Sequence, residues 1–180
     1  MTERKKIFAI VGSASKHSAN QKLVMHLAAL TKDDLEFTVC NDLKTLPHFD
    51  PELSADSPPK EIIALRNEIE KADGVLICTP EYVYSIPSGL KNAIEWCIAT
   101  TVFTAKPAGL ITAAAGGEKA HEELQLIMKT AMCSFTTGTT LLIRGIRGKI
   151  NEVGEIIDAG TANDLIKFIE AFKNLVADSG

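Results

Sequence analysis

The chain has 180 residues, a formal net charge of −4 and 46% hydrophobic residues. This length favours one domain over residues 1–180 with a sizeable core. The acidic balance argues against a nucleic-acid partner, and no apolar run is long enough to span a bilayer.

Strand-like apolar runs alternate with helix-like patterns five times. We expect strands over residues 6–11, 35–40, 74–78, 108–112 and 139–143. Apolar residues at helical spacing mark the inward faces of the helices that follow: Leu23, Val24 and Leu27; Ile62, Leu65, Ile69 and Ala72; Leu90, Ala93, Ile94, Cys97 and Ile98; Ala120, Leu124, Ile127, Met128 and Ala131; Leu165, Ile169, Phe172 and Val176. Strands separated by helices pair in parallel with right-handed crossovers, so the fold class is α/β with a doubly wound five-stranded parallel sheet.

Two features of the chain concern its compartment. The four cysteines are scattered and form no CxxC pair, and residues 1–6 lead directly into a strand without the pattern of a signal peptide. We therefore expect a cytoplasmic protein with reduced thiols. The four histidines show no metal-ligand spacing, and His121 is expected on a polar helix face, so we assign no metal.

A loop rich in Gly, Ser and Asn follows the first strand and leads into a helix. Its residues 12–20 include Ser13, Ser15, Ser18 and Asn20 as hydrogen-bond donors. A strand, such a loop and a helix N-terminus together suit a phosphate, because unpaired N–H groups point at the anion. The alternative is an ordinary turn with Ser18 as a helix cap. The loop has neither a Walker A pattern nor a GxGxxG fingerprint.

A second specialised loop follows the strand over residues 74–78. Two prolines and two tyrosines lie in residues 80–87, before a helical pattern that includes Trp96. Ligands of open α/β sheets bind outside the carboxyl ends of the strands, which makes this loop a candidate site. A rigid proline-rich turn suits the flat ring of a flavin, although a purely structural turn would look the same. We expect Glu81 to hold the loop rather than to act as a general base.

The two loops together resemble the NADPH-dependent FMN reductases, flavodoxin-like enzymes that include chromate, quinone and azo-dye reductases. The resemblance rests on Gly12, Ser13, Ser18 and Asn20, and on Pro80-Glu81-Tyr82, Ser85-Ile86-Pro87 and residues 90–96. Ser15 stands where the family usually has Arg, Val83 where it has Asn, and Ser88 where it has Gly. Lys16 offers only a point charge in place of that Arg.

The resemblance implies the strand order 2-1-3-4-5 and one FMN-binding domain. It implies an NAD(P)H oxidoreductase in which hydride passes from NADPH or NADH to FMN, and then to a quinone, azo, metal-oxyanion or free-flavin acceptor. The flavin performs the chemistry, so no catalytic side chain is assigned. The candidate cofactor-binding residues are Gly12, Ser13, Ser15, Lys16, Ser18, Ala19, Asn20, Pro80, Glu81, Tyr82, Val83, Tyr84, Ser85, Ala114, Ala115, Gly116 and Gly117.

Two other functions share the expected sheet. A flavodoxin-like electron-transfer protein without NAD(P)H turnover would be more acidic and would lack the Pro-Glu-Tyr…Ser-Ile-Pro stretch. A phosphoacceptor receiver domain needs acidic residues after its first strand and an Asp ending its third, and residues 11–13 and 78–80 contain neither.

Assembly is expected from two apolar residues that lie off the inward faces of their helices. Trp96 and Leu126 occupy such positions, and both helices start beside the proposed flavin loops. Matching exposed groups on two helices favour an isologous dimer. The family resemblance implies a homodimer or homotetramer.

Overall fold

In the computed structural model, which describes residues 3–15 and 18–179, five strands form one parallel sheet. The strand order is β2-β1-β3-β4-β5, as expected from the family resemblance. The strands are β1 (Lys5–Val11), β2 (Leu35–Cys40), β3 (Gly74–Thr79), β4 (Ala108–Ala114) and β5 (Thr140–Arg144). The helices are α1 (Ala19–Leu30), α2 (Pro51–Ser54), α3 (Lys60–Lys71), α4 (Ser88–Ile98), α5 (Glu118–Thr130) and α6 (Ala159–Ala177), with 3₁₀ turns η1 (Leu43–Thr45), η2 (Thr137–Thr139) and η3 (Ile146–Gly148).

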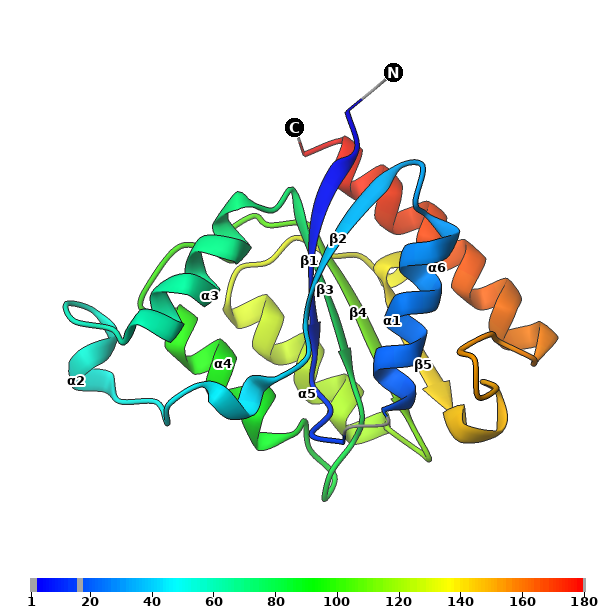
Figure 1. The fold of residues 1–180 in the computed structure, drawn as a ribbon, viewed down its shortest axis with the longest axis horizontal. Coiled ribbons are helices and arrows are strands. Elements are labelled where there is room, and N and C mark those ends of the chain that lie inside the picture. Colours follow the sequence, from blue (N-terminus) through cyan, green and yellow to red (C-terminus); the bar gives the residue numbers. More distant parts are fainter. Residues whose placement is uncertain (1–2, 16–17, 180) are drawn as a thin grey trace.

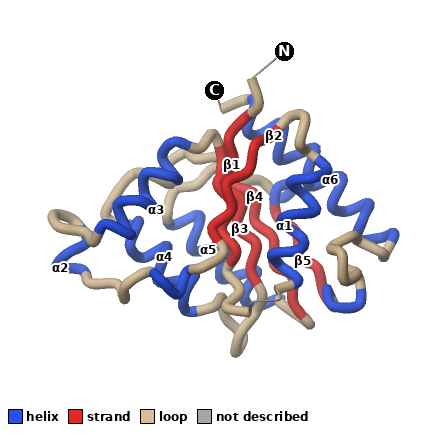
Figure 2. Tube along the Cα trace, viewed as in Figure 1, coloured by secondary structure: helices blue, strands red, loops and turns tan. Residues whose placement is uncertain are grey.

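The helices cover both faces of the sheet. Helices α1 and α6 pack on one face and α3, α4 and α5 on the other, and each layer has its own apolar core. Figure 2 shows the sheet edge-on between the two helical layers. Every residue of β3 and β4 is buried, which agrees with their uninterrupted apolar sequences.

The inward faces expected from helical spacing are largely confirmed. Leu23, Val24 and Leu27 on α1 are 0% exposed, and so are Leu124 and Met128 on α5. The prediction for Ile98 is wrong: this residue, the last of α4, is 53% exposed.

The prediction that Trp96 is exposed is wrong. Its side chain is 0% exposed, its Nε1–H donates to the carbonyl of Pro47 at 2.9 Å, and Phe49 packs edge-on at 5.4 Å. Asn92 fixes the same segment, because its Nδ2 donates to the Pro47 carbonyl and its Oδ1 accepts from the Phe49 amide. The loop between β2 and α3 therefore covers the outer face of α4.

A buried arginine completes this arrangement. Arg66 on α3 is 9% exposed and donates to the carbonyls of Trp96 and Ser54. These carbonyls lie near the carboxyl ends of α4 and α2, where the helix dipole favours a cation. Arg66 thus links three helices beneath the segment that buries Trp96.

Two further expectations change. Strand β4 continues through Ala114, so Ala113 and Ala114 belong to the strand rather than to the loop after it. His121 is not on a polar face: it is half-buried, and its Nδ1 lies 3.0 Å from Oγ1 of Thr112 on β4. Burial lowers the pKa of His121, with a weaker opposing effect from Glu122.

Candidate functional site

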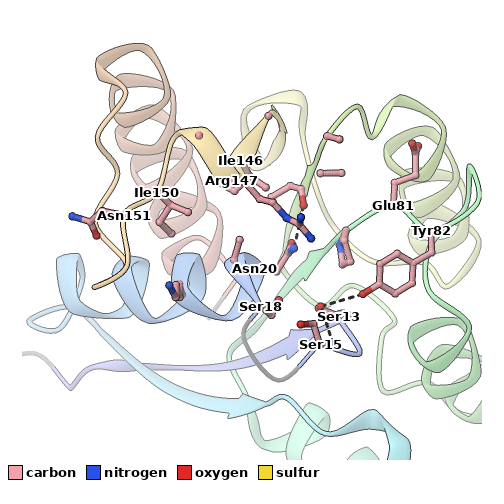
Figure 3. Close-up of a pocket in the computed structure, with 18 of the residues that line it drawn as sticks. Ser13, Ser15, Ser18, Asn20, Glu81, Tyr82, Ile146, Arg147, Ile150 and Asn151 are labelled. Carbon is pink, nitrogen blue, oxygen red and sulfur yellow. Dashed lines mark hydrogen bonds between the residues drawn. The ribbon is translucent and has the colours of Figure 1, made fainter.

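A cavity of about 780 Å³ lies at the carboxyl ends of the strands, at the edge where open α/β sheets bind ligands. Its volume is within the range of small-molecule sites. Figure 3 shows that α1, the loop after β3 and the loop after β5 surround it. Its lining residues are Ser13, Ser15, Ser18, Ala19, Asn20, Lys22, Pro80, Glu81, Tyr82, Ala113, Ala114, Ala115, Gly145, Ile146, Arg147, Gly148, Ile150, Asn151 and Glu152.

The loop after β1 begins with a glycine that the packing requires. A Cβ at Gly12 would lie 2.4 Å from Oγ1 of Thr79 and 3.0 Å from Cδ2 of Leu90. Only a residue without a side chain lets the end of β1 approach β3 and α4 this closely. The chain then turns toward the cavity, which Ser13 and Ser15 line.

The N-terminus of α1 forms one end of the cavity. Ser18 is its N-cap, and the Ser18 hydroxyl accepts from the amide of Gln21 at 3.4 Å. The hydroxyls of Ser13, Ser15 and Ser18, together with the first N–H groups of α1, form a donor set that suits a phosphate. Lys16, also predicted for this site, lies outside the described residues.

Asn20 connects α1 to two strands beneath the cavity. It is 3% exposed, its Nδ2 donates to the Ala113 carbonyl at 3.1 Å, and its Oδ1 accepts from the Cys78 thiol at 3.3 Å. Burial raises the pKa of Cys78, so its thiol stays protonated and can donate. One amide hydrogen of Asn20 is left for a ligand, because Nδ2 carries two.

The loop after β3 ends in a two-residue hairpin turn. The Tyr82 and Ser85 backbones exchange hydrogen bonds of 2.9 and 3.1 Å across it. Val83 and Tyr84 between them have φ of 53° and 59°, as a type I′ turn requires. Neither residue type favours this conformation, and their side chains are 94% and 80% exposed.

Carboxylates fix this loop to α5 in both directions. Glu81 accepts from the amides of Ala120 at 3.0 Å and Gly117 at 3.3 Å, at the N-terminus of α5. Glu123 on α5 accepts from the Ser85 hydroxyl at 2.7 Å and the Ile86 amide at 2.9 Å. The expectation that Glu81 holds the loop is confirmed. These four hydrogen bonds hold the loop against α5 where it borders the cavity.

Tyr82 separates this cavity from a second one. Its hydroxyl lies 3.4 Å from the Ser13 hydroxyl (Figure 3), and both residues line both cavities. The second cavity, of about 690 Å³, lies on the side of η1 and the start of α4. Its lining residues are Gly12, Ser13, Ala14, Ser15, Gln21, Asn41, Asp42, Leu43, Lys44, Leu46, His48, Tyr82, Pro87, Ser88, Gly89 and Asn92.

The structure brings most of the candidate residues to the main cavity, but not all. Its lining includes Ser13, Ser15, Ser18, Ala19, Asn20, Pro80, Glu81, Tyr82, Ala114 and Ala115. Gly12 lines the second cavity instead, and Val83, Tyr84 and Ser85 lie in the hairpin turn. Gly116 and Gly117 precede α5, where Gly117 has φ of 104°.

Sequence reasoning missed one side of the cavity. Residues 145–152, which the sequence analysis did not assign to the site, supply Ile146, Arg147, Ile150 and Asn151 to its lining (Figure 3). Lys22 on α1 also lines it. The available signal was position, because the segment follows the carboxyl end of a strand in the same parallel sheet.

In residues 3–15 and 18–179, no three His, Cys, Asp or Glu side chains gather as metal ligands would. Within that same part of the chain, no helix has the length and apolar character needed to cross a membrane.

Several reductases are similar in sequence to this chain over more than nine-tenths of its length. The quinone reductase of Escherichia coli (strain K12) is 28% identical over 98% of this chain and 97% of its own length. The NADH-dependent flavin reductase subunit 2 of Lactobacillus johnsonii is 32% identical over 92% of this chain and 97% of its own. The 2-hydroxy-1,4-benzoquinone reductase of a Burkholderia species is 30% identical over 96% and 97%.

Solved structures of flavin-related proteins are also similar to this chain. FerB, a flavoenzyme NAD(P)H:(acceptor) oxidoreductase from Paracoccus denitrificans, superposes with a TM-score of 0.78 and 28% identity, covering 98% of this chain and 99% of FerB. An archaeal flavodoxin, at 8% identity and a TM-score of 0.62, shares the fold. A family model described as NADPH-dependent FMN reductase matches residues 5–145. The chain therefore belongs to the NADPH-dependent FMN reductase family.

Proposed function

We propose that the protein is an FMN-dependent NAD(P)H oxidoreductase that reduces a small-molecule acceptor, a quinone or a free flavin. The observation that carries this proposal is that two loops line one cavity: the serine-rich loop that leads into α1, and the loop after β3, which is hydrogen-bonded to α5. FMN, when bound, supplies a hydride-transfer chemistry that no protein side chain carries.

The donor set of the cavity fits FMN in two parts. The hydroxyls of Ser13, Ser15 and Ser18 and the N–H groups of α1 would hold the phosphate. Pro80, Tyr82 and the small residues Ala114 and Ala115 would border the ring, since small side chains allow a close approach of the backbone. Lys16, Gly12, Gly116 and Gly117 remain candidates in the flanking loops. Glu81 acts indirectly, because its carboxylate is already bonded to α5.

FMN titration of the flavin-free protein tests the proposed site. Ser18→Ala removes a hydroxyl that is 5% exposed, so FMN affinity should fall by ~1–3 kcal/mol. Ser179→Ala is the matched control, since that hydroxyl bonds only within the last turn of the chain. Unchanged FMN affinity in both Ser18→Ala and Asn20→Ala would contradict the placement.

The donor is proposed to be NADPH or NADH with weak discrimination, because Ser15 lacks the bidentate charge of an arginine. Steady-state kinetics with each donor decides this. A preference for NADPH above roughly a hundredfold, about 2.7 kcal/mol, would contradict it. The alternative function, an electron-transfer protein without NAD(P)H turnover, would show no oxidation of either donor.

We further propose that residues 1–180 form one domain that assembles as a homodimer or homotetramer in the cytoplasm. Leu126 on α5 is 65% exposed and supports the assembly, whereas Trp96 no longer does. The cytoplasm supplies NAD(P)H, and the four cysteines are free thiols, as in reducing compartments. Light scattering of Leu126→Glu should show a smaller species than the wild type. A wild type that is monomeric at micromolar concentration would refute the assembly.

A further inference from the structure

The loop after β5 holds a fixed backbone at the cavity. Gly145, with φ of 64°, donates its amide to the Ala115 carbonyl at 3.1 Å and so joins this loop to the end of β4. On either side of Arg147, Ile146 is 4% and Ile150 8% exposed. Buried neighbours on both sides fix the position of Arg147, the middle residue of η3.

Arg147 differs from the other basic residues of its segment. Arg144 pairs with Glu118, and Lys149 lies 3.8 Å from Asp158. Among residues 3–15 and 18–179, Arg147 has no acidic partner within 4.0 Å and no side-chain hydrogen bond. Its side chain extends into the cavity instead (Figure 3). A guanidinium carries five donors that suit a phosphate, and those of Arg147 face the ligand space.

Arg147, on the loop after β5, lines the same cavity as Ser18 and Asn20 at the start of α1, and Figure 3 shows its side chain directed toward that part of the cavity. The same loop continues along α1, where the position of a Cβ on Gly154 lies 3.6 Å from Cβ of Lys22. Within residues 3–15 and 18–179, four charged side chains line the cavity: Lys22, Arg147, Glu81 and Glu152. Glu81 is bonded to the start of α5, so its charge is already compensated there. The described residues that the first loop contributes to the lining, Ser13, Ser15 and Ser18, carry no charge.

We propose that Arg147 binds the phosphate of FMN together with the start of α1, and thereby makes the site select FMN over riboflavin. This assignment rests on the proposed function, because it requires that the cavity takes FMN. It places a charge that recognises phosphate on the loop after β5, in addition to the hydroxyl and N–H donors at the start of α1.

Calorimetric titration of the flavin-free protein with FMN and with riboflavin tests the assignment. Arg147→Ala should weaken FMN binding about tenfold to a hundredfold, the size of a charge-assisted hydrogen-bond pair, and leave riboflavin affinity unchanged. Arg147→Lys should restore part of the loss, since a point charge cannot bind in a bidentate way. Arg144→Ala, which removes an adjacent arginine that pairs with Glu118, should change neither affinity.

The outcomes separate the assignment from the proposed function. Equal weakening of FMN and riboflavin would place Arg147 against the ring and overturn the assignment. Unchanged FMN affinity in Arg147→Ala would also overturn the assignment, even if the KM for NADPH rose. A wild type that binds neither flavin would refute the proposed function itself. Arg147 is exposed, so circular dichroism of Arg147→Ala should match the wild type.

Discussion

Substitution of Glu81 tests whether this residue has a structural role or a catalytic one. Its carboxylate is hydrogen-bonded to the N-terminus of α5. It accepts from two backbone amides, Ala120 at 3.0 Å and Gly117 at 3.3 Å. Glu81→Ala leaves both amides without their acceptor and removes the charge at the helix N-terminus. The sum is about 2–4 kcal/mol of lost stability. Glu81→Gln keeps one acceptor oxygen and should lose about 1–2 kcal/mol.

Urea unfolding of both variants measures these losses, and FMN titration measures the effect on the site. Glu122→Gln is the matched control, since Glu122 is on α5, the helix to which Glu81 is bonded, and pairs with Lys119 at the surface, where solvent weakens the interaction. We expect the loss of stability and of FMN affinity to be largest in Glu81→Ala, smaller in Glu81→Gln and smallest in the control. A Glu81→Gln variant with wild-type stability and wild-type FMN affinity but no activity would refute the reasoning and make Glu81 a general acid or base.

Three other substitutions test the packing around the site. Gly12→Ala places a Cβ 2.4 Å from the Thr79 hydroxyl, so urea unfolding should show a loss of ~1–3 kcal/mol and FMN affinity should fall; wild-type values would contradict the close approach. Val83→Asn puts a residue that tolerates positive φ into the type I′ turn and should raise the melting temperature by stabilising the protein ~1 kcal/mol; a lower melting temperature would contradict the strain. Trp96→Phe removes the donor to Pro47 and part of a buried ring, so it should destabilise by about 1–3 kcal/mol in thermal unfolding, and light scattering should show an unchanged assembly state. A smaller species of Trp96→Phe in light scattering would indicate that Trp96 lies in a subunit interface after all.

The sheet could be predicted because its strands are continuous apolar runs, which parallel strands buried on both faces require. The strand order was predicted from the family resemblance, because periodicity does not determine it. The error at Trp96 shows what periodicity leaves out. Helical spacing assigns Trp96 to the outer face of α4, but it does not say that Pro47 and Phe49 fold back over that face.

The parts of the site that lie in a sequence motif could be predicted. The resemblance covers the loops after β1 and β3, and Glu81 could be interpreted as a structural residue before its partners were known. Residues 145–152 lie in neither motif, and composition alone does not place Arg147 in a cavity. Only the strand order brings the end of β5 beside the end of β4, where Gly145 bonds to Ala115.

The most direct test of the central claim is anaerobic mixing of the FMN-loaded protein with NADPH and, separately, NADH in a stopped-flow spectrometer. The account predicts that the flavin absorbance bleaches with both donors and returns when a quinone is added. A flavin that stays oxidised with both donors, although FMN is bound, would contradict an NAD(P)H oxidoreductase and favour an electron-transfer protein.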